Sequence, residues 1–233
     1  MERTGLYSPY GYRQASQPQP QPSHLPELLD QRRAAIEKEK DGSTALKLLH
    51  KGPVKHPALL QYLEKRKIAA TLVEKYLYQI HFTPADQAKK YFAIGWPAGS
   101  GYEARNSLFK GFVGVGKDVT YLEALNSSVC AVFERFLDFL AYLNFHKHSE
   151  LPFSAVVLNS GALKARAVAQ ILEGKYDVVR LFLDNDQAGD AGTTYFKELL
   201  GTISVLDCRD QYRGFKDFNE MMMSASPGFS FSS

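Results

Sequence analysis

Short apolar runs alternate with helical patterns along the second half of the chain. From Val119 onward the runs predict five strands, and the patterns between the later ones predict three helices. The strands are VTYLEA, SVCAVFE, SAVVLN, VVRLFLD and TISVLD, and the helices are RFLDFLAYLNFHK, ALKARAVAQILEG and AGTTYFKELLG. The Val-rich strands are apolar at consecutive positions, which is typical of parallel strands covered on both faces. Residues 119–224 are therefore predicted to form an α/β fold with an open, mainly parallel sheet and flanking helices.

Residues 51–118 have a different pattern, which predicts a small α+β lobe. Leu59, Leu60 and Leu63 recur at helical spacing in HPALLQYLEKRKI, and a second short helix is expected in TLVEKYL. Strand-like segments follow in LYQIHF, YFAIGW, YEAR and KGFV. This lobe precedes the predicted parallel sheet directly.

The first fifty residues lack the periodicity of a packed domain. They hold five of the eleven prolines, and Gln alternates with Pro from Gln17 to Pro22. Alternating prolines favour an extended, solvated backbone. We expect a flexible Gln/Pro-rich linker over residues 1–50 and a short tail over residues 225–233.

The composition excludes several classes of protein. Each apolar run is far shorter than the roughly 20 residues that span a bilayer, and the chain does not open on the pattern of a secretory signal. The two cysteines, Cys130 and Cys208, exclude a disulfide scaffold and a four-cysteine zinc site. We therefore expect a cytoplasmic protein that makes no membrane contact and binds no zinc through this chain.

The net charge of +3 hides an uneven distribution along the chain. Residues 51–120 carry eleven Lys and Arg against five Asp and Glu, a balance of +6, whereas residues 121–233 carry ten against fourteen, a balance of −4. A basic segment beside an acidic one is consistent with a polyanion-binding surface next to a cation site. Charge alone also fits two ordinary solvated faces.

Acidic residues follow two of the predicted strands directly. VCAVF runs into Glu134, with Asp138 one helical turn later, and VVRLFL runs into Asp184 and Asp186. If the last two continue their strand, they project on the same side, because side chains alternate with a period of two. Carboxylates that converge at the carboxyl edge of such a sheet repel one another, and a divalent cation removes that repulsion. Mg²⁺ suits this donor set because it prefers oxygen ligands and leaves room for phosphate oxygens.

The segment DNDQAG allows two other interpretations. The segment matches the start of an EF-hand loop, but the twelfth position is Tyr195 instead of a bidentate Glu, and a strand precedes it, so the EF-hand is rejected. Alternatively, Asp184 caps the following helix and Asp186 favours its N-terminal dipole. Taken without Glu134, this capping interpretation is about as well supported as the metal site.

These motifs together resemble the Toprim domain of bacterial primases, topoisomerases and some nucleases. The resemblance rests on a strand ending in Glu, an Asp four residues later, and a strand ending in Asp-x-Asp followed by Ala-Gly. The closing GFKDFNEMM resembles the Lys-Asp-x-Asp/Asn segment of the primase branch, and the upstream lobe is similar to primase-like proteins of mobile elements. The resemblance covers residues 56–224.

The resemblance implies roles for matching positions. Glu134 would be the catalytic acid or base and a metal ligand, together with Asp184 and Asp186, while Asp138 and Asp217 would be secondary acidic positions. The cofactor would be Mg²⁺ or Mn²⁺. Because phosphate contacts supply most sequence-independent affinity, candidates for binding phosphate or nucleic acid are Arg105, Lys110, Lys117 and Lys216.

Three features depart from the family pattern. The family usually has Gly where Arg135 follows the Glu, so a bulky cation either narrows the site or approaches a phosphate. Asn219 replaces a frequent Asp and removes one charge from a second-metal position. Two distant cysteines cannot build the zinc ribbon with which such proteins usually begin, so we expect either a fragment or a version that works without its own ribbon.

The resulting first hypothesis is a primase-like nucleotidyl transferase that acts on single-stranded DNA in DNA replication or mobile-element transfer. It would use nucleoside triphosphates and work with a separate helicase or zinc-ribbon segment. A Toprim nuclease and a non-catalytic DNA-binding accessory module are the alternatives.

Overall fold

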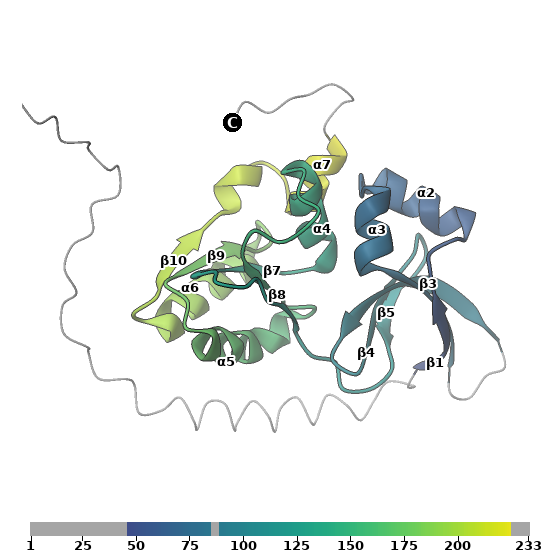
Figure 1. Ribbon diagram of the computed structural model, residues 1–233, viewed down its shortest axis with the longest axis horizontal. Coiled ribbons are helices and arrows are strands. Elements are labelled where there is room, and N and C mark those ends of the chain that lie inside the picture. Colours follow the sequence, from purple (N-terminus) through teal and green to yellow (C-terminus); the bar gives the residue numbers. More distant parts are fainter. Residues whose placement is uncertain (1–45, 85–88, 225–233) are drawn as a thin grey trace, which may run out of the picture.

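The structure is a computed structural model that describes residues 46–84 and 89–224. Two five-stranded sheets lie side by side, each with its own helices (Figure 1). The expected tail and most of the expected linker lie outside the described residues. None of the described helices combines the length and hydropathy that a membrane crossing requires.

The first sheet is antiparallel and follows chain order. Its strands are β1 (Leu46–Gly52), β2 (Tyr78–Pro84), β3 (Tyr91–Ala98), β4 (Gly101–Arg105) and β5 (Lys110–Val113). Two helices, α2 (Pro57–Lys65) and α3 (Ala70–Tyr76), connect β1 to β2. Leu46 and Leu48 of β1 pack on an apolar cluster of this sheet, so residues 46–50 belong to the lobe and not to the expected linker.

The second sheet has the predicted parallel architecture. Its order is β10-β9-β7-β8-β6, with β6 (Thr120–Leu122) antiparallel to its neighbour and the other strands parallel: β7 (Val129–Phe133), β8 (Ser154–Val157), β9 (Val178–Phe182) and β10 (Ser204–Asp207). Between them lie the three predicted helices, α4 (Phe136–Phe145), α5 (Lys164–Gly174) and α6 (Gln187–Leu200). A short helix α7 (Phe218–Ser224) and two 3₁₀ turns, η2 (Gly161–Leu163) and η3 (Arg209–Tyr212), complete this lobe.

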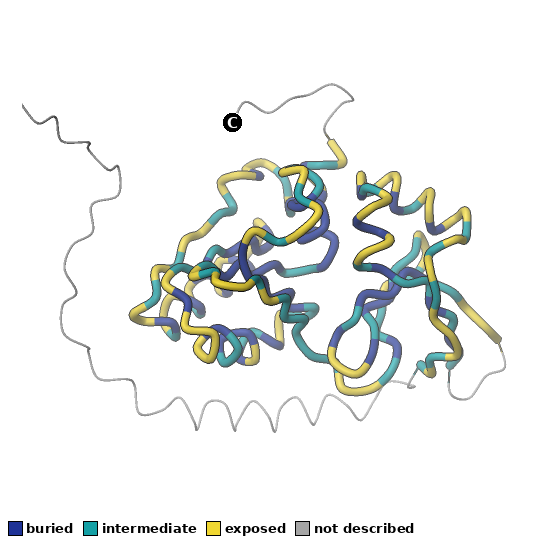
Figure 2. The backbone as a smooth tube through the Cα atoms, in the orientation of Figure 1, coloured by how far each residue is buried: buried dark blue, intermediate teal, exposed yellow. Residues whose placement is uncertain are grey.

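Each face of the parallel sheet is covered by its own apolar layer. Alternate strand residues such as Val132 and Leu181 pack with α5 and α6, and the intervening ones such as Phe133 and Phe182 pack with α4 and α7. Figure 2 shows the central strands buried and the exposed positions on the outer helices and loops. The consecutive apolar positions in the sequence therefore did indicate a sheet buried on both sides.

The two sheets share one of these layers. Trp96 of β3 is 1% exposed and its ring stacks on Phe136 of α4, with centroids 5.6 Å apart and planes 8° apart. Its indole N–H donates to Thr120 Oγ1 at 3.0 Å. Residues of α2 and α3, including Leu59 and Leu72, belong to the same cluster. The lobe and the sheet domain are thus joined by a common core.

Candidate functional site

The site forms where the parallel strands β7 and β9 end. Phe133 and Phe182 are partners in adjacent strands, so the residues that follow them meet at the same edge. Glu134 Oε2 accepts a hydrogen bond from the Asp184 backbone N–H at 3.0 Å, and the Glu134 backbone N–H donates to Phe182 O at 3.3 Å. The side chain of Glu134 is thereby fixed beside Asp184, as the sequence pattern predicted.

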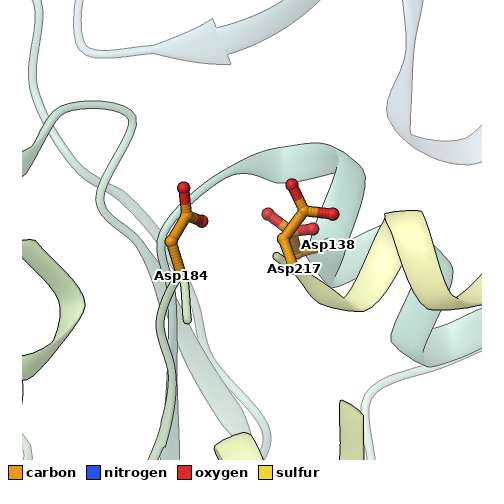
Figure 3. A group of neighbouring side chains, drawn as sticks. All are labelled: Asp138, Asp184 and Asp217. Atoms are coloured by element: carbon orange, nitrogen blue, oxygen red, sulfur yellow. The ribbon is translucent and has the colours of Figure 1, made fainter. Parts of the chain in front are cut away.

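Three aspartates converge at this edge. Asp138 comes from the first turn of α4, Asp184 follows β9, and Asp217 directly precedes α7. Each offers a carboxylate oxygen, and the three oxygens lie within 4.8 Å of one another. Figure 3 shows the Asp138 and Asp217 side chains next to each other, with Asp184 beside them. We call these three residues the aspartate cluster.

Two members of the aspartate cluster are buried and incompletely hydrogen-bonded, and Asp217 is half-buried. Asp138 is 2% exposed and Asp184 is 1% exposed. Asp138 Oδ2 and Asp184 Oδ1 have no hydrogen-bond partner among the described residues. Burial raises the pKa of the Asp138 carboxyl well above its ordinary value, and the charge of Asp217 raises it further. Unpaired buried carboxylate oxygens are costly, and they are the donors that Mg²⁺ or Mn²⁺ takes, so the residues fit a divalent cation.

Asp138→Asn is expected to raise the free energy of unfolding of the metal-free protein by about 1–2 kcal/mol. An amide keeps the acceptor for the Asn219 backbone N–H, now 3.1 Å from Asp138 Oδ1, and removes a buried charge. Because folding raises the pKa of Asp138, the cost of its charge is present at neutral pH and is lost as the pH falls through the raised pKa. Urea denaturation in EDTA at pH 7 and at pH 5.5 measures both effects. Equal or lower stability of the variant at pH 7 contradicts the expectation.

Two cations face the aspartate cluster. Arg135 Nη2 lies 3.2 Å from Asp184 Oδ2 and 3.6 Å from Glu134 Oε1. Lys216 Nζ lies 3.5 Å from the same oxygen of Asp184. Burial raises the pKa of the Asp184 carboxyl, and the charge of Arg135 partly offsets this rise. The sequence identified Lys216 as a phosphate-binding candidate; the structure places it against a carboxylate.

Asp186 has a different place from the one that strand periodicity predicted. Strand β9 ends at Phe182, and Asp186 is the N-cap of α6, where its Oδ1 accepts from the Gly189 N–H at 3.0 Å. The side chain therefore does not continue the alternation of the strand. The capping interpretation described this part of the motif, although the cap is Asp186 and not Asp184. Asp186 is exposed and is not part of the aspartate cluster.

The basic candidates of the antiparallel lobe differ in their surroundings. Arg105 lies over the Phe136 ring, 5.9 Å from its centroid, and burial lowers its pKa. Lys110 is largely exposed; partial desolvation lowers its pKa, and so do the neighbouring charges of Arg135 and Arg105. Lys117 Nζ is 2.5 Å from Glu103 Oε1, so its charge is already paired. Arg105 and Lys110 therefore extend the positive potential of Arg135 and are the better candidates for phosphate contacts.

Two residues that position the site were not recognised as such from the sequence. Gly189 opens α6, and a Cβ atom there would overlap with the backbone carbonyl oxygen of Asp184. Asn219 is 1% exposed; its side chain accepts from Arg66 Nη1 at 3.0 Å and donates to Arg66 O at 2.9 Å. Gly189 was part of the Asp-x-Asp-x-Ala-Gly motif, but the sequence did not show its close approach to the Asp184 carbonyl oxygen. The pairing of Asn219 with Arg66 spans the two lobes.

Asn219→Asp is expected to lower the free energy of unfolding by about 2 kcal/mol. The carboxylate would keep Arg66 Nη1 as a partner. It would also face the Arg66 carbonyl oxygen without a donor and would add a negative charge next to buried Asp138, and we expect these two costs to outweigh the retained contact. Urea denaturation of the variant and the wild type gives the difference. Asn219→Ala is the comparison: it removes the hydrogen bonds without adding a charge, so Asp at this position should be no better tolerated than Ala at neutral pH. If Asn219→Ala were as stable as the wild type, the hydrogen bonds of this side chain to Arg66 would not contribute to joining the lobes.

Two family models match separate segments of the chain. One family model, described as a domain of unknown function (DUF8464), matches residues 48–114, and a second, described as Toprim-like, matches residues 131–222. No curated protein sequence matches the chain.

Two solved structures share the fold. The primase fragment of the bacteriophage T7 primase-helicase protein has a TM-score of 0.51 at 14% sequence identity, covering 82% of this chain and 80% of that one. A chain in a structure of the bacteriophage T7 lagging-strand DNA polymerase, which interacts with primase domains of two gp4 subunits bound to an RNA/DNA hybrid and dTTP, has a TM-score of 0.53 at 16% identity, covering 69% and 83%. Residues 131–222 therefore match a Toprim-like family model, and the chain shares the fold of the T7 primase fragment.

Proposed function

We propose that this protein is a primase-like nucleotidyl transferase that uses Mg²⁺ or Mn²⁺ and copies single-stranded DNA from nucleoside triphosphates. The observation that carries the proposal is the buried aspartate cluster, with unpaired oxygens on Asp138 and Asp184 and with Arg135 and Lys216 beside it. The primase-like fold and the Toprim-like match support it. A role in DNA replication follows from this activity.

The aspartate cluster and Glu134 would hold the divalent cation. A bound cation supplies positive charge that neutralises phosphate oxygens and makes a hydroxyl more acidic. The carboxylates are fixed before any ligand arrives, because Asp138 is held by the Asn219 N–H and Glu134 by the Asp184 N–H. Such preorganisation means that little reorganisation is required at the moment of reaction.

The reaction joins the 3′ oxygen of one nucleotide to the α-phosphorus of the next and breaks the bond to pyrophosphate. Glu134 would accept the proton of the 3′ hydroxyl. Burial raises the pKa of its carboxyl, and a higher pKa makes the carboxylate a stronger base. Lys216, whose Nζ lies 3.5 Å from Asp184 Oδ2, would supply positive charge beside the carboxylates that hold the cation.

The template would bind over the basic lobe. Besides burial, the charge of Arg135 lowers the pKa of both Arg105 and Lys110, so these two residues would extend positive charge from the lobe towards the site. Arg and Lys side chains of this kind contact the phosphate backbone without reading the sequence. We infer a sequence-tolerant and salt-sensitive interaction with single-stranded DNA.

The full chain incubated with a single-stranded DNA template, the four ribonucleoside triphosphates and Mg²⁺ or Mn²⁺ tests the proposal. Template-dependent products longer than a dinucleotide, absent in EDTA, are the expected result. Shortened DNA without added nucleotides would instead show a nuclease. DNA binding that survives both EDTA and removal of the carboxylates, with no product of either kind, would show an accessory module.

A further inference from the structure

Arg135 occupies an unusual place in the site. It is the N-cap residue of α4, with an extended backbone (φ −138°, ψ 156°), and its side chain makes no capping hydrogen bond to the helix. Its guanidinium instead lies against the carboxylates of Asp184 and Glu134. The guanidinium of Arg135 therefore contacts Oδ2 of Asp184, a residue of the aspartate cluster.

The ion pair between Arg135 and Asp184 is partly buried, which strengthens the interaction of the two charges. The Asp184 side chain is 1% exposed and that of Arg135 is 26% exposed. Charges in such a partly buried position interact more strongly than surface pairs, which are weakened by water and salt. Breaking the pair would leave Asp184 with Lys216 at 3.5 Å as its other cationic partner.

We propose that Arg135 is a built-in counter-ion that competes with the divalent cation for Asp184 and Glu134. In the metal-free protein the guanidinium offsets the charge of the buried carboxylates. The unpaired Oδ1 of Asp184 belongs to the same carboxylate as the Oδ2 that Arg135 contacts. A divalent cation bound to this carboxylate would therefore bring a second positive charge beside the guanidinium, which would be repelled and turn towards solvent. Arg135 thereby sets how tightly the site binds metal.

The alternative for Arg135 is a purely structural ion pair. Such a pair would stabilise the protein equally with and without metal. A competing cation has opposite effects in the two states: it stabilises the metal-free protein and weakens metal binding. The two roles are therefore separated by measuring stability and metal affinity on the same variants.

The experiment measures binding of Mn²⁺ alone to the full chain by electron paramagnetic resonance of the free ion. Arg135→Ala and Arg135→Gln are expected to bind Mn²⁺ about tenfold more tightly than the wild type, and Arg135→Lys to bind within about twofold of it. Arg166→Ala is the matched control, because Arg166 also pairs with an aspartate (Asp118, at 2.8 Å) but lies on α5, among the helices of the opposite face of the sheet. It should leave the affinity unchanged.

Thermal unfolding gives the second readout. In EDTA the Arg135→Gln variant should unfold at a lower temperature than the wild type, and in saturating Mn²⁺ this difference should shrink or reverse. Equal Mn²⁺ affinity of the wild type and both uncharged variants overturns the proposal, and so does weaker binding by the variants.

This inference rests on the metal-binding part of the proposed function and not on the reaction. If neither the wild type nor any variant binds Mn²⁺, the proposed metal site and the role of Arg135 both fail. If all bind with one affinity, only the role of Arg135 fails. The Gln variant keeps most of the side-chain stem, so the comparison stands even if the Ala variant does not fold.

Discussion

Asp184→Asn is expected to lower template-dependent nucleotide incorporation about 1,000-fold, because it removes charge stabilisation of several kcal/mol at the centre of the site. Asp184 belongs to the aspartate cluster and also faces both cations of the site. An amide nitrogen in place of Oδ2 would point a donor at the Arg135 guanidinium. The rate of incorporation by the variant and the wild type, at equal protein concentration and saturating Mg²⁺, measures the effect.

A matched control separates this effect from a change of net charge. Asp210→Asn makes the same chemical change at a side chain that is 82% exposed and pairs with exposed Arg213, so the rate should stay within about twofold. Asp186→Asn should lie between the two, since Asn also caps a helix and the fold is kept. Circular dichroism confirms that each variant is folded. A folded Asp184→Asn protein that retains a tenth or more of the wild-type rate contradicts the proposed site.

Gly189→Ala is expected to lower the free energy of unfolding by about 3 kcal/mol or more, a cost at the upper end for overpacking. The added Cβ would overlap with the Asp184 backbone carbonyl oxygen, which is not a flexible side chain that can turn aside. Ala is favoured over Gly in a helix by up to about 1 kcal/mol, which is too little to offset this clash. Relief of the overlap requires the first turn of α6 to move away from Asp184, so binding of Mn²⁺ should weaken as well.

Gly161→Ala is the control for this substitution. Gly161 is exposed, its φ is not in the left-handed region, and a Cβ there meets no atom within 4 Å. Its stability should equal that of the wild type or exceed it slightly. Urea denaturation of both variants gives the comparison. A Gly189→Ala protein as stable as Gly161→Ala would show that α6 does not need its close approach to Asp184.

The sheet and its acidic edge could be predicted because their signals are local. Consecutive apolar residues identified the buried strands, and parallel strands place their carboxyl ends at one edge. Glu134 and Asp184 are therefore neighbours in the structure as the sequence predicted. The prediction that Asp186 continues the alternation of strand β9 was wrong. The strand ends at Phe182, and Asp186 is the N-cap of helix α6.

The rest of the site depends on contacts between distant segments. Asp217 entered the prediction through the resemblance, because no spacing shows that α7 packs on α4 and brings Asp217 to Asp138. The pairing of Arg66 with Asn219 joins residues 153 positions apart. The Arg135 side chain points towards Asp184, a residue 49 positions away in the sequence. The sequence therefore identified Arg135 as unusual for the family, but it could not identify Asp184 as its partner. These features require the packed structure.

The common core beneath Trp96 has a consequence for how the chain can be divided. Sequence families separate residues 48–114 from residues 131–222, as if two modules could be exchanged independently. In the structure, Trp96 stacks on Phe136 of the second segment, and Arg66 donates a hydrogen bond to Asn219 across the same boundary. A chimeric protein that kept one segment and replaced the other would lose these contacts unless the new segment carried matching residues. The two matched segments therefore share one folding unit, and a substitution in their common core is expected to disturb both the basic lobe and the acidic site.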